Sequence, residues 1–432
     1  MTINFRYRIY KTFITLKKRI NNGSRLSSSF LKLMTLLKNF GIKAYVFYVG
    51  KIKYSISTRI FDRDGKNLKN ISEASPTDIV YLSELSRTSR KNDHQVKGGD
   101  WDKLIRRFED SEFFNNVSEA LRGNIPIEAT QQFANIEKAF SNHQYVSEEN
   151  QTLTFNEKWQ ELQRLYQDHQ SNQNTLSDEV LPVLSGVIVD IGRNGDLLLA
   201  DGYLYLALAK LFELETIPIT IDTRHVKWLI FRKRFHELVI TVLSRAYQPP
   251  LHPDLMYIPA EQSSVERYQI IKQNMEAKSG LLLDLGANAG YFSIKFEYDG
   301  FDCTAVEIFP NFIFCLLGQK RALNKHLTVV EDSFLDRPDL LEQEYDVVLA
   351  LNVFSHLIVH KETFEKLDDF LGKLKCKELF FEPYSPNDPQ MKNSFVNFTE
   401  DEFAEYVRLK LGKANVKIIG KASDGRWIYK IS

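Results

Sequence analysis

The sequence predicts an α/β fold built around a mostly parallel, doubly wound sheet in the C-terminal part, with a smaller α+β domain before it. Three observations support this prediction. An apolar run, LLLDL at 281–285, is long enough for a buried strand and is followed by a loop that contains Gly286 and Gly290. Further apolar runs follow in order along the chain. A hydrophobic fraction of 43% and a formal net charge of zero are typical of a globular chain of 432 residues.

The first strand and loop of the C-terminal part predict a ligand site. Gly286 and Gly290 let the backbone approach a ligand closely, and the loop opens into a helix whose N-terminus favours a carboxylate or a phosphate. The next apolar run, TAVEIF at 304–309, carries Glu307 where a carboxylate can accept hydrogen bonds from ribose hydroxyls. These residues therefore predict a nucleotide-type ligand at the first crossover of a parallel sheet.

The spacing of this loop differs from a dinucleotide fingerprint, which would need glycines where this chain has Asn288 and Tyr291. The pattern D-x-G-x-x-x-G with a downstream acid resembles the first motif of class I S-adenosyl-L-methionine (SAM)-dependent methyltransferases. Three later segments agree with this resemblance as the third, fourth and fifth strands: VVEDSF (329–334), YDVVLALNVFSHL (345–357) and KELFFEP (377–383). The resemblance implies a Rossmann-like methyltransferase domain over about 255–432, with SAM as its cofactor.

The resemblance also implies which residues bind the cofactor. Those expected around its methionine end are Asp284, Gly286, Asn288 and Gly290, and Ala287 and Asn352 are also expected to bind the cofactor. Glu307 is expected to bind the ribose, Asp332 the adenine amine, and Phe309 the face of the adenine ring. A core role for Phe309 and a turn-capping role for Asp332 are the alternatives.

The catalytic candidates follow the predicted fourth and fifth strands. His356 is the first choice for a general base because an imidazole titrates near neutrality. Glu382 in FFEP is the second choice, and Asn352 lies at the end of the fourth strand. The main alternative for His356 is a structural or gating role. No metal site is predicted, because no carboxylate motif accompanies the pair His356 and His360.

Some acceptor classes are disfavoured by the same loops. Enzymes that methylate amino groups of nucleic acids resemble one another in an Asn/Asp-Pro-Pro-aromatic loop, and 352–354 lacks both prolines. Methylation of cytosine C5 would require a Pro-Cys nucleophile, and no cysteine here follows a proline. These exclusions favour O-methylation of a small-molecule or glycan-type acceptor. The long loop 382–403 is expected to form a substrate lid, and Thr399 with Glu402 is expected to cap the next helix.

Residues 62–247 predict the smaller α+β domain, which contains a helical insertion. GVIVDIGRNGDLLLAD at 186–201 places two short strands around Asn194-Gly195, a preferred hairpin turn, and a helix and a strand follow. The order of these elements, together with IPITIDTRHVKW, resembles the ParB/sulfiredoxin-like nucleotide-binding fold over about 185–230. No histidine or arginine follows Asp201-Gly202 directly, which disfavours phosphate chemistry and favours a degenerate binding or scaffolding module.

Residues 1–61 predict a basic amphipathic arm. They contain 13 lysines and arginines and no aspartate or glutamate, and their apolar residues recur three and four positions apart. Such an arm can pack on the protein itself, contact an anionic membrane surface, or bind nucleic acid, which is the least favoured of the three.

The remaining features favour a cytoplasmic location, with peripheral membrane contact through the arm. No apolar run approaches the roughly 20 residues that span a bilayer, no secretory signal is expected, and the three cysteines suit a reducing compartment. Two alternatives to an enzyme remain open: a non-catalytic adaptor that binds a nucleotide or SAM, and a nucleic-acid-binding ParB-like protein.

Overall fold

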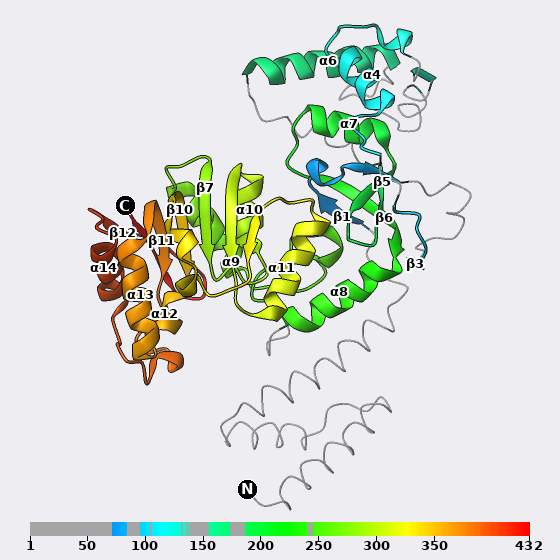
Figure 1. The fold of residues 1–432 in the computed structure, drawn as a ribbon. Helices are drawn as coiled ribbons and strands as arrows, with labels where there is room; N and C mark the ends of the chain where they lie inside the picture. The colour runs from blue at the N-terminus through cyan, green and yellow to red at the C-terminus, as the bar shows by residue number, and fades with distance from the viewer. Residues whose placement is uncertain are drawn as a thin grey trace, which may run out of the picture. The chain divides into compact units, whose positions relative to one another are not determined.

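The computed structural model describes residues 71–83, 96–103, 106–130, 133–134, 137, 155–172, 186–240 and 245–432. All of them belong to one compact unit, Lys69–Ile240 with Arg245–Ser432. They form two sheets, here called the upstream sheet and the C-terminal sheet (Figure 1). The basic arm predicted for 1–61 lies outside the described residues.

The upstream sheet is mixed and has six strands in the described part of the chain. In sequence order these are β1 (Ile71–Ala74), β2 (Tyr81–Leu82), β3 (Val96–Lys97), β4 (Val187–Ile191), β5 (Leu197–Asp201) and β6 (Ile217–His225). Their order in space is β1-β6-β4-β5-β2, and β3 also pairs with β6. β4 and β5 form an antiparallel hairpin around Asn194-Gly195, as predicted, and β4 runs parallel to β6.

Among the described residues, four helices accompany the upstream sheet: α4 (Glu112–Leu121), α6 (Phe155–Asn172), α7 (Tyr203–Leu211) and α8 (Val226–Val239). β6 alternates in burial because successive side chains point to opposite faces, so that Ile217, Ile219 and Ile221 enter the core at 1% exposure each. α7 is apolar nearly throughout, and the side chains from Leu204 to Ala209 are all buried. The likeness of this arrangement to the ParB/sulfiredoxin-like fold stays a prediction.

The C-terminal sheet has seven strands. Five are parallel: β7 (Gly280–Leu285), β8 (Phe301–Val306), β9 (Thr328–Val330), β10 (Glu344–Leu351) and β11 (Lys375–Glu382). The last two, β12 (Val416–Lys421) and β13 (Trp427–Ile431), form an antiparallel hairpin at one edge. The spatial order is β12-β13-β11-β10-β7-β8-β9. The predicted Rossmann-like, mostly parallel sheet is therefore confirmed, and the antiparallel hairpin completes one edge.

Helices cover both faces of this sheet, and alternate strand residues enter two separate cores. Leu283, Val348 and Phe381 belong to the core under α12 (Phe354–Leu357), α13 (Lys361–Lys373) and α14 (Glu400–Lys410). Leu282 and Leu349 belong to the core under α9 (Ser263–Asn274), α10 (Tyr291–Tyr298) and α11 (Pro310–Ala322). This two-residue period is what a strand buried on both faces requires.

The strand order also fixes where a ligand can bind. β7 lies between β8 and β10, so the connections from β7 and from β10 leave on opposite sides of the sheet. In doubly wound folds the usual ligand position is at the carboxyl ends of the strands, between two such connections. The segments that follow β7, β8 and β10 are therefore the expected ligand-binding segments.

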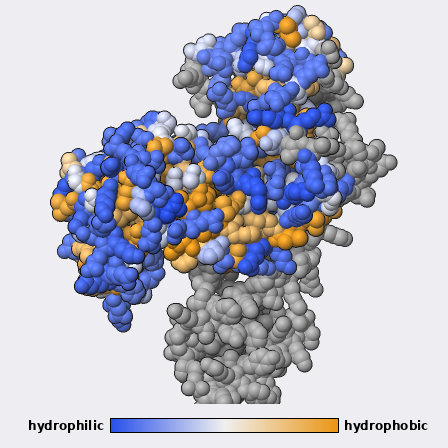
Figure 2. Space-filling view, in the orientation of Figure 1, coloured by the Kyte–Doolittle hydropathy of each residue, from blue (hydrophilic) through white to orange (hydrophobic). Residues whose placement is uncertain are grey.

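Apolar side chains gather on one face of the surface, over α8 and α11 (Figure 2). Exposed apolar residues on these helices and directly before α11 include Ile230 (65%), Phe309 (58%) and Phe314 (40%). Among the described helices, none combines the length and the apolar character that a membrane crossing requires.

Candidate functional site

The loop between β7 and α10 holds a backbone conformation that favours glycine. Gly286 and Gly290 have φ angles of 77° and 88°. The N–H groups of Gly286 and Ala287 both donate to the carbonyl of Val306 at 2.9 Å, which ties the loop to the end of β8. A Cβ on Gly290 would lie 2.1 Å from Cδ1 of Leu316, so the loop has no room for a side chain there.

Glu307 follows β8 and is only 5% exposed. Its Oε1 accepts from the N–H groups of Ile308 and Phe309, and its Oε2 from the N–H of Asn288, each at 2.8 Å. A carboxylate offers about four acceptor positions. The backbone therefore fixes the direction of this side chain and leaves Oε2 with capacity for one further donor.

Asp284 lies at the end of β7 and is 3% exposed. The hydroxyl of Ser293 donates to its Oδ2 at 2.6 Å. Burial, with a smaller effect of the nearby charge of Glu307, raises the pKa of Asp284 to about 6. A cation placed beside this carboxyl group would favour its charged form.

Asn352 ends β10 with a φ angle of 66°, in the left-handed region. Its Nδ2 donates to Oε1 of Glu382 at 2.7 Å and to the hydroxyl of Tyr247 at 3.2 Å, and its backbone N–H donates to the carbonyl of Glu382 at 2.9 Å. Its Oδ1 is buried and has no partner among the described residues. An unpaired buried acceptor costs about 1–3 kcal/mol, so this position favours a ligand with a hydrogen-bond donor.

Glu382 ends β11 and is fully buried. The guanidinium of Arg267, on α9, donates to both carboxylate oxygens, with Nη2 at 2.7 Å from Oε1. Nη2 of Arg267 also lies 2.5 Å from Oδ2 of Asp424. Because Glu382 already accepts from Arg267 and Asn352, its geometry favours fixing these two groups over the predicted role of a base.

His356 lies on the short helix α12 with its ring exposed. Its Nε2 is 3.2 Å from the hydroxyl of Tyr384, and the two rings meet edge to face. Partial desolvation lowers the pKa of His356 below its usual value, and the positive charge of Arg426 lowers it further. The imidazole is therefore neutral at pH 7 and able to accept a proton.

The two residues predicted to contact adenine occupy different surroundings. Phe309 precedes α11 with its ring 58% exposed and edge-to-face against Phe312, so a flat apolar surface is available next to Glu307. Asp332 is exposed after β9, and its Oδ1 accepts from the N–H of Ser333 at 2.8 Å. The N-cap of the short helix that follows, Phe334–Asp336, is Ser333, and contact of Asp332 with adenine stays a prediction.

Several residues of this site carry no motif and were missed in the sequence. Tyr384 and Arg426 come together near His356, with the Cζ of Arg426 4.5 Å from the centre of the Tyr384 ring. Arg267 offered only a weak signal: it precedes Ile271 by four positions, on the buried face of α9. Tyr247, the last residue of the predicted upstream domain, reaches Asn352 through its hydroxyl.

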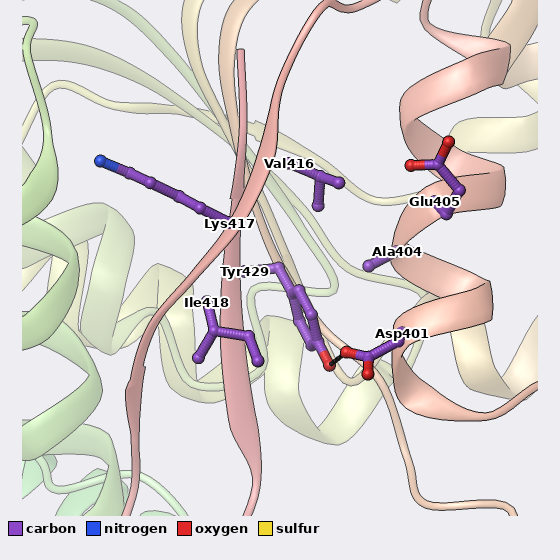
Figure 3. Close-up of a pocket in the computed structure, with 7 residues that line it drawn as sticks. All are labelled: Asp401, Ala404, Glu405, Val416, Lys417, Ile418 and Tyr429. Carbon is purple, nitrogen blue, oxygen red and sulfur yellow. Dashed lines mark hydrogen bonds between the residues drawn. The ribbon is translucent and has the colours of Figure 1, made fainter.

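A groove also lies at the far edge of the C-terminal sheet, between α14 and the β12–β13 hairpin (Figure 3). Its volume is about 270 Å³, and the hydroxyl of Tyr429 donates to Asp401 at 2.6 Å on its wall. β11 and β10 separate this edge from β7. The groove is therefore not part of the site at the carboxyl ends of β7, β8 and β10.

Comparison with known proteins matches residues 266–382, about a quarter of the chain, to the family model of a methyltransferase domain. No curated protein sequence matches the chain. Among solved structures, the chain is similar to magnesium protoporphyrin IX methyltransferase from Synechocystis PCC 6803, with 13% identity and a TM-score of 0.30 over 39% of this chain and 77% of that one.

Two further solved structures are similar at the same level. The bifunctional kinase-methyltransferase WbdD has 17% identity and a TM-score of 0.32, over 40% of this chain and 38% of that one. The methyltransferase domain of bacterial CtHen1 has 16% identity and a TM-score of 0.32, over 40% and 98%. Likenesses at this level indicate neither an acceptor nor a partner. The family match itself identifies residues 266–382 as a methyltransferase domain, and its cofactor is S-adenosyl-L-methionine.

Proposed function

We propose that the chain is an active SAM-dependent methyltransferase that methylates an oxygen atom of a small-molecule or glycan-type acceptor. One observation supports this most strongly. Three adjacent strands, β7, β8 and β10, are followed by the loop to α10 (here called the glycine loop), by Glu307 and by Asn352, at the edge where the strand order reverses. The same edge carries His356 with Tyr384 beside it.

The residues at this edge fit the proposed cofactor. Asp284 and the unpaired Oδ1 of Asn352 supply acceptors for the ammonium group at its methionine end. Glu307 has capacity for a ribose hydroxyl, and the exposed ring of Phe309 offers a surface for adenine. When bound, SAM supplies a methyl group on a positively charged sulfur, which is an excellent leaving group.

The chain's own residues must then align the acceptor and remove its proton. A hydroxyl acceptor needs a base, and His356 is neutral at pH 7 because of partial desolvation and Arg426. Tyr384 belongs to the loop 382–403 predicted as a lid, and its hydroxyl lies within hydrogen-bonding distance of His356. Phe395, in the same loop, is 51% exposed and offers an apolar face for a sugar ring.

The direct test is a calorimetric titration of the full chain with SAM, compared with Glu307→Ala. Loss of a charge-assisted hydrogen bond costs about 1.5–3 kcal/mol, so the variant should bind SAM roughly 10- to 100-fold more weakly. Glu405→Ala, in the groove beside α14, is the matched control and should bind like the wild type. A folded chain that does not bind SAM would overturn the proposal.

Turnover requires a second measurement, with methyl-labelled SAM and a panel of hydroxyl-bearing sugars and small molecules. Transfer of label to an oxygen atom is the expected result. The adaptor alternative would be favoured if the chain bound SAM but transferred no label to any acceptor class, and if replacing His356 left SAM binding unchanged.

For the upstream sheet we propose a ParB/sulfiredoxin-like binding or scaffolding role. The succession β4, β5, α7 and β6 supports it, as does a first turn of α7 made of Tyr203, Leu204 and Tyr205, which lacks a group to stabilise a phosphoryl transfer. Titration with CTP and ATP under the same conditions tests this role. Micromolar binding with hydrolysis would contradict it.

For residues 1–61 we propose peripheral membrane contact by a cytoplasmic protein, because the segment is basic and amphipathic in sequence. Co-sedimentation with vesicles containing anionic lipid is the test, with neutral vesicles as control. Strongly salt-dependent binding to DNA instead would favour the nucleic-acid alternative.

A further inference from the structure

The segment 247–254, here called the strap, runs between α8 and α9. The first half of the strap contacts residues in and around the glycine loop between β7 and α10. The hydroxyl of Tyr247 accepts from Nδ2 of Asn352 at 3.2 Å. Oε1 of Gln248 accepts from the N–H of Tyr291 at 3.2 Å, and the N–H of Leu251 donates to Oε1 of Gln319 at 2.7 Å. Three points of the strap are thus bonded to residues around the proposed donor site.

Two glutamines connect the strap to the glycine loop itself. Gly290 is the N-cap of α10 and has no side chain to cap the helix, and Gln248 supplies an acceptor to its first N–H from outside. Gln319, on α11, is fully buried and donates through Nε2 to the carbonyl of Ala289 at 2.9 Å. Its other amide atom holds Leu251, so this one side chain joins the loop to the strap.

The second half of the strap is bonded to the upstream sheet. The backbone N–H of Asp254 donates to Nδ1 of His252, which places the ring proton on Nε2, and Nε2 donates to the carbonyl of Gly195 in the β4–β5 turn at 2.9 Å. Oδ1 of Asp254 accepts from Nε and Nη2 of Arg224 at 3.0 and 2.9 Å. Its Oδ2 accepts from Nε1 of Trp228 at 2.8 Å.

The strap has little freedom to yield between these two sets of contacts. Gln248, His252 and Asp254 are each at most 5% exposed. At the β4–β5 turn, a Cβ on Gly195 would lie 2.4 Å from Ala322 of α11 and 2.5 Å from Trp228. In close-packed surroundings of this kind a displacement at one end moves the neighbouring groups instead of being absorbed by empty space.

We propose that the strap makes the upstream sheet part of the donor site, with Gln248 and Gln319 as positioning residues for the glycine loop. Asp254 acts through the strap: its bonds to Arg224 and Trp228 hold the segment that in turn holds Gln248 and Leu251. The affinity for SAM therefore depends on contacts in the upstream sheet that touch no cofactor atom. The consequence for affinity rests on the proposed function, whereas the effect on the loop does not.

The test uses the full chain and two variants, one at each end of the strap. Trp228→Phe removes the N–H that donates to Asp254 and keeps an aromatic ring, and Gln319→Met removes the bonds to Ala289 and Leu251. Hydrogen exchange is measured without SAM, on peptides that cover 247–252 and 288–292, and SAM affinity is measured by calorimetry. We expect each variant to exchange faster in both peptides and to bind SAM about five-fold more weakly, a change of about 1 kcal/mol.

Ser111→Ala is the control, because it removes the cap of α4 in the upstream part, where no strap residue makes a hydrogen bond. It should leave both peptides and the SAM affinity unchanged. Unchanged exchange at 288–292 in Trp228→Phe, or an equal increase in Ser111→Ala, would overturn the strap proposal. If the wild type bound no SAM but the two variants still exchanged faster than the wild type in both peptides, only the proposed function would be overturned.

Discussion

At the scale of single residues, protonation decides what the site can do at neutral pH. Burial raises the pKa of Asp284 to about 6, whereas partial desolvation and Arg426 lower the pKa of His356. The pKa of Asp284 therefore lies about one unit below pH 7, and His356 is an unprotonated base at that pH. A carboxyl group with a pKa of about 6 is still mostly charged at pH 7, so the site keeps a negative group for a cation and an unprotonated base for a hydroxyl acceptor.

We therefore expect His356→Gln to lower kcat for an accepted acceptor by about 100-fold, the lower range for loss of a general base. The Kd for SAM should not change. In the wild type, kcat/KM should rise with pH through a value below 6.5, because the pKa of His356 is lowered, and this acid limb should disappear in the variant. The measurement is a pH–rate profile of both proteins.

Tyr384→Phe is the control for this prediction, since it removes the hydroxyl beside His356 but leaves the imidazole. It should keep the acid limb and lose less rate. Wild-type kcat in His356→Gln would assign the base to another group and leave His356 with the structural or gating role considered from the sequence.

Site residues that lie close together in the sequence could be predicted from their spacing, whereas site residues that meet only through tertiary packing could not. The spacing of Gly286, Gly290 and Glu307 along one strand–loop–helix unit placed the acid at the end of β8, where the structure has it. Nothing local relates Arg267 to Glu382, 115 positions later. Their contact exists because α9 packs against the sheet near the end of β11, which no window of sequence contains.

At the scale of elements, Gly318 lets α11 pack closely against α8. A Cβ on Gly318 would lie 2.1 Å from Cζ of Phe231, whose ring also stacks against Trp228 and contacts Phe314. We expect Gly318→Ala to lower the free energy of unfolding by about 1–3 kcal/mol through overpacking. Phe231→Leu in the same chain should recover part of this loss, which urea denaturation would measure.

Gly372→Ala on α13 is the matched control, because its added Cβ would meet nothing within 4 Å. There the better helix propensity of alanine should raise stability by roughly 0.5–1 kcal/mol. If the two alanine variants changed stability by the same amount and in the same direction, the contact between α8 and α11 would not be the one described.

Element types followed from sequence more readily than element neighbours. The hairpin at Asn194-Gly195 is present as predicted, and so is the helix cap in which Thr399 and Glu402 exchange hydrogen bonds. Each depends on a few adjacent residues. The pairing of β1 and β2 with strands more than 100 positions later could not be predicted, since it depends on loop closure and not on local propensity.

At the scale of the whole molecule, buried titratable groups act on stability in opposite directions. Burial raises the pKa values of Asp78 and Asp284 to about 6, so the folded state binds more protons at these sites between pH 3.8 and 6 and gains stability as the pH falls. Burial lowers the pKa of His252 to about 4. The unfolded state binds more protons at this histidine between pH 4 and 6.5, so its contribution to stability is lost as the pH falls through that range.

The contribution of His252 can be separated by comparing the wild type with His252→Asn at each pH. A difference of about 2.5 pKa units corresponds to roughly 3 kcal/mol. The difference in free energy of unfolding between the wild type and the variant should therefore fall by this amount from pH 6.5 to pH 4. Urea unfolding followed by tryptophan fluorescence is a suitable measurement, because the ring of Trp228 lies 4.4 Å from that of His252. If the difference in stability between the wild type and the variant did not change with pH, His252 would be solvated in the folded chain. The second half of the strap would then not form the buried connection between the two sheets that the hydrogen bonds of His252 to Gly195 and Asp254 describe.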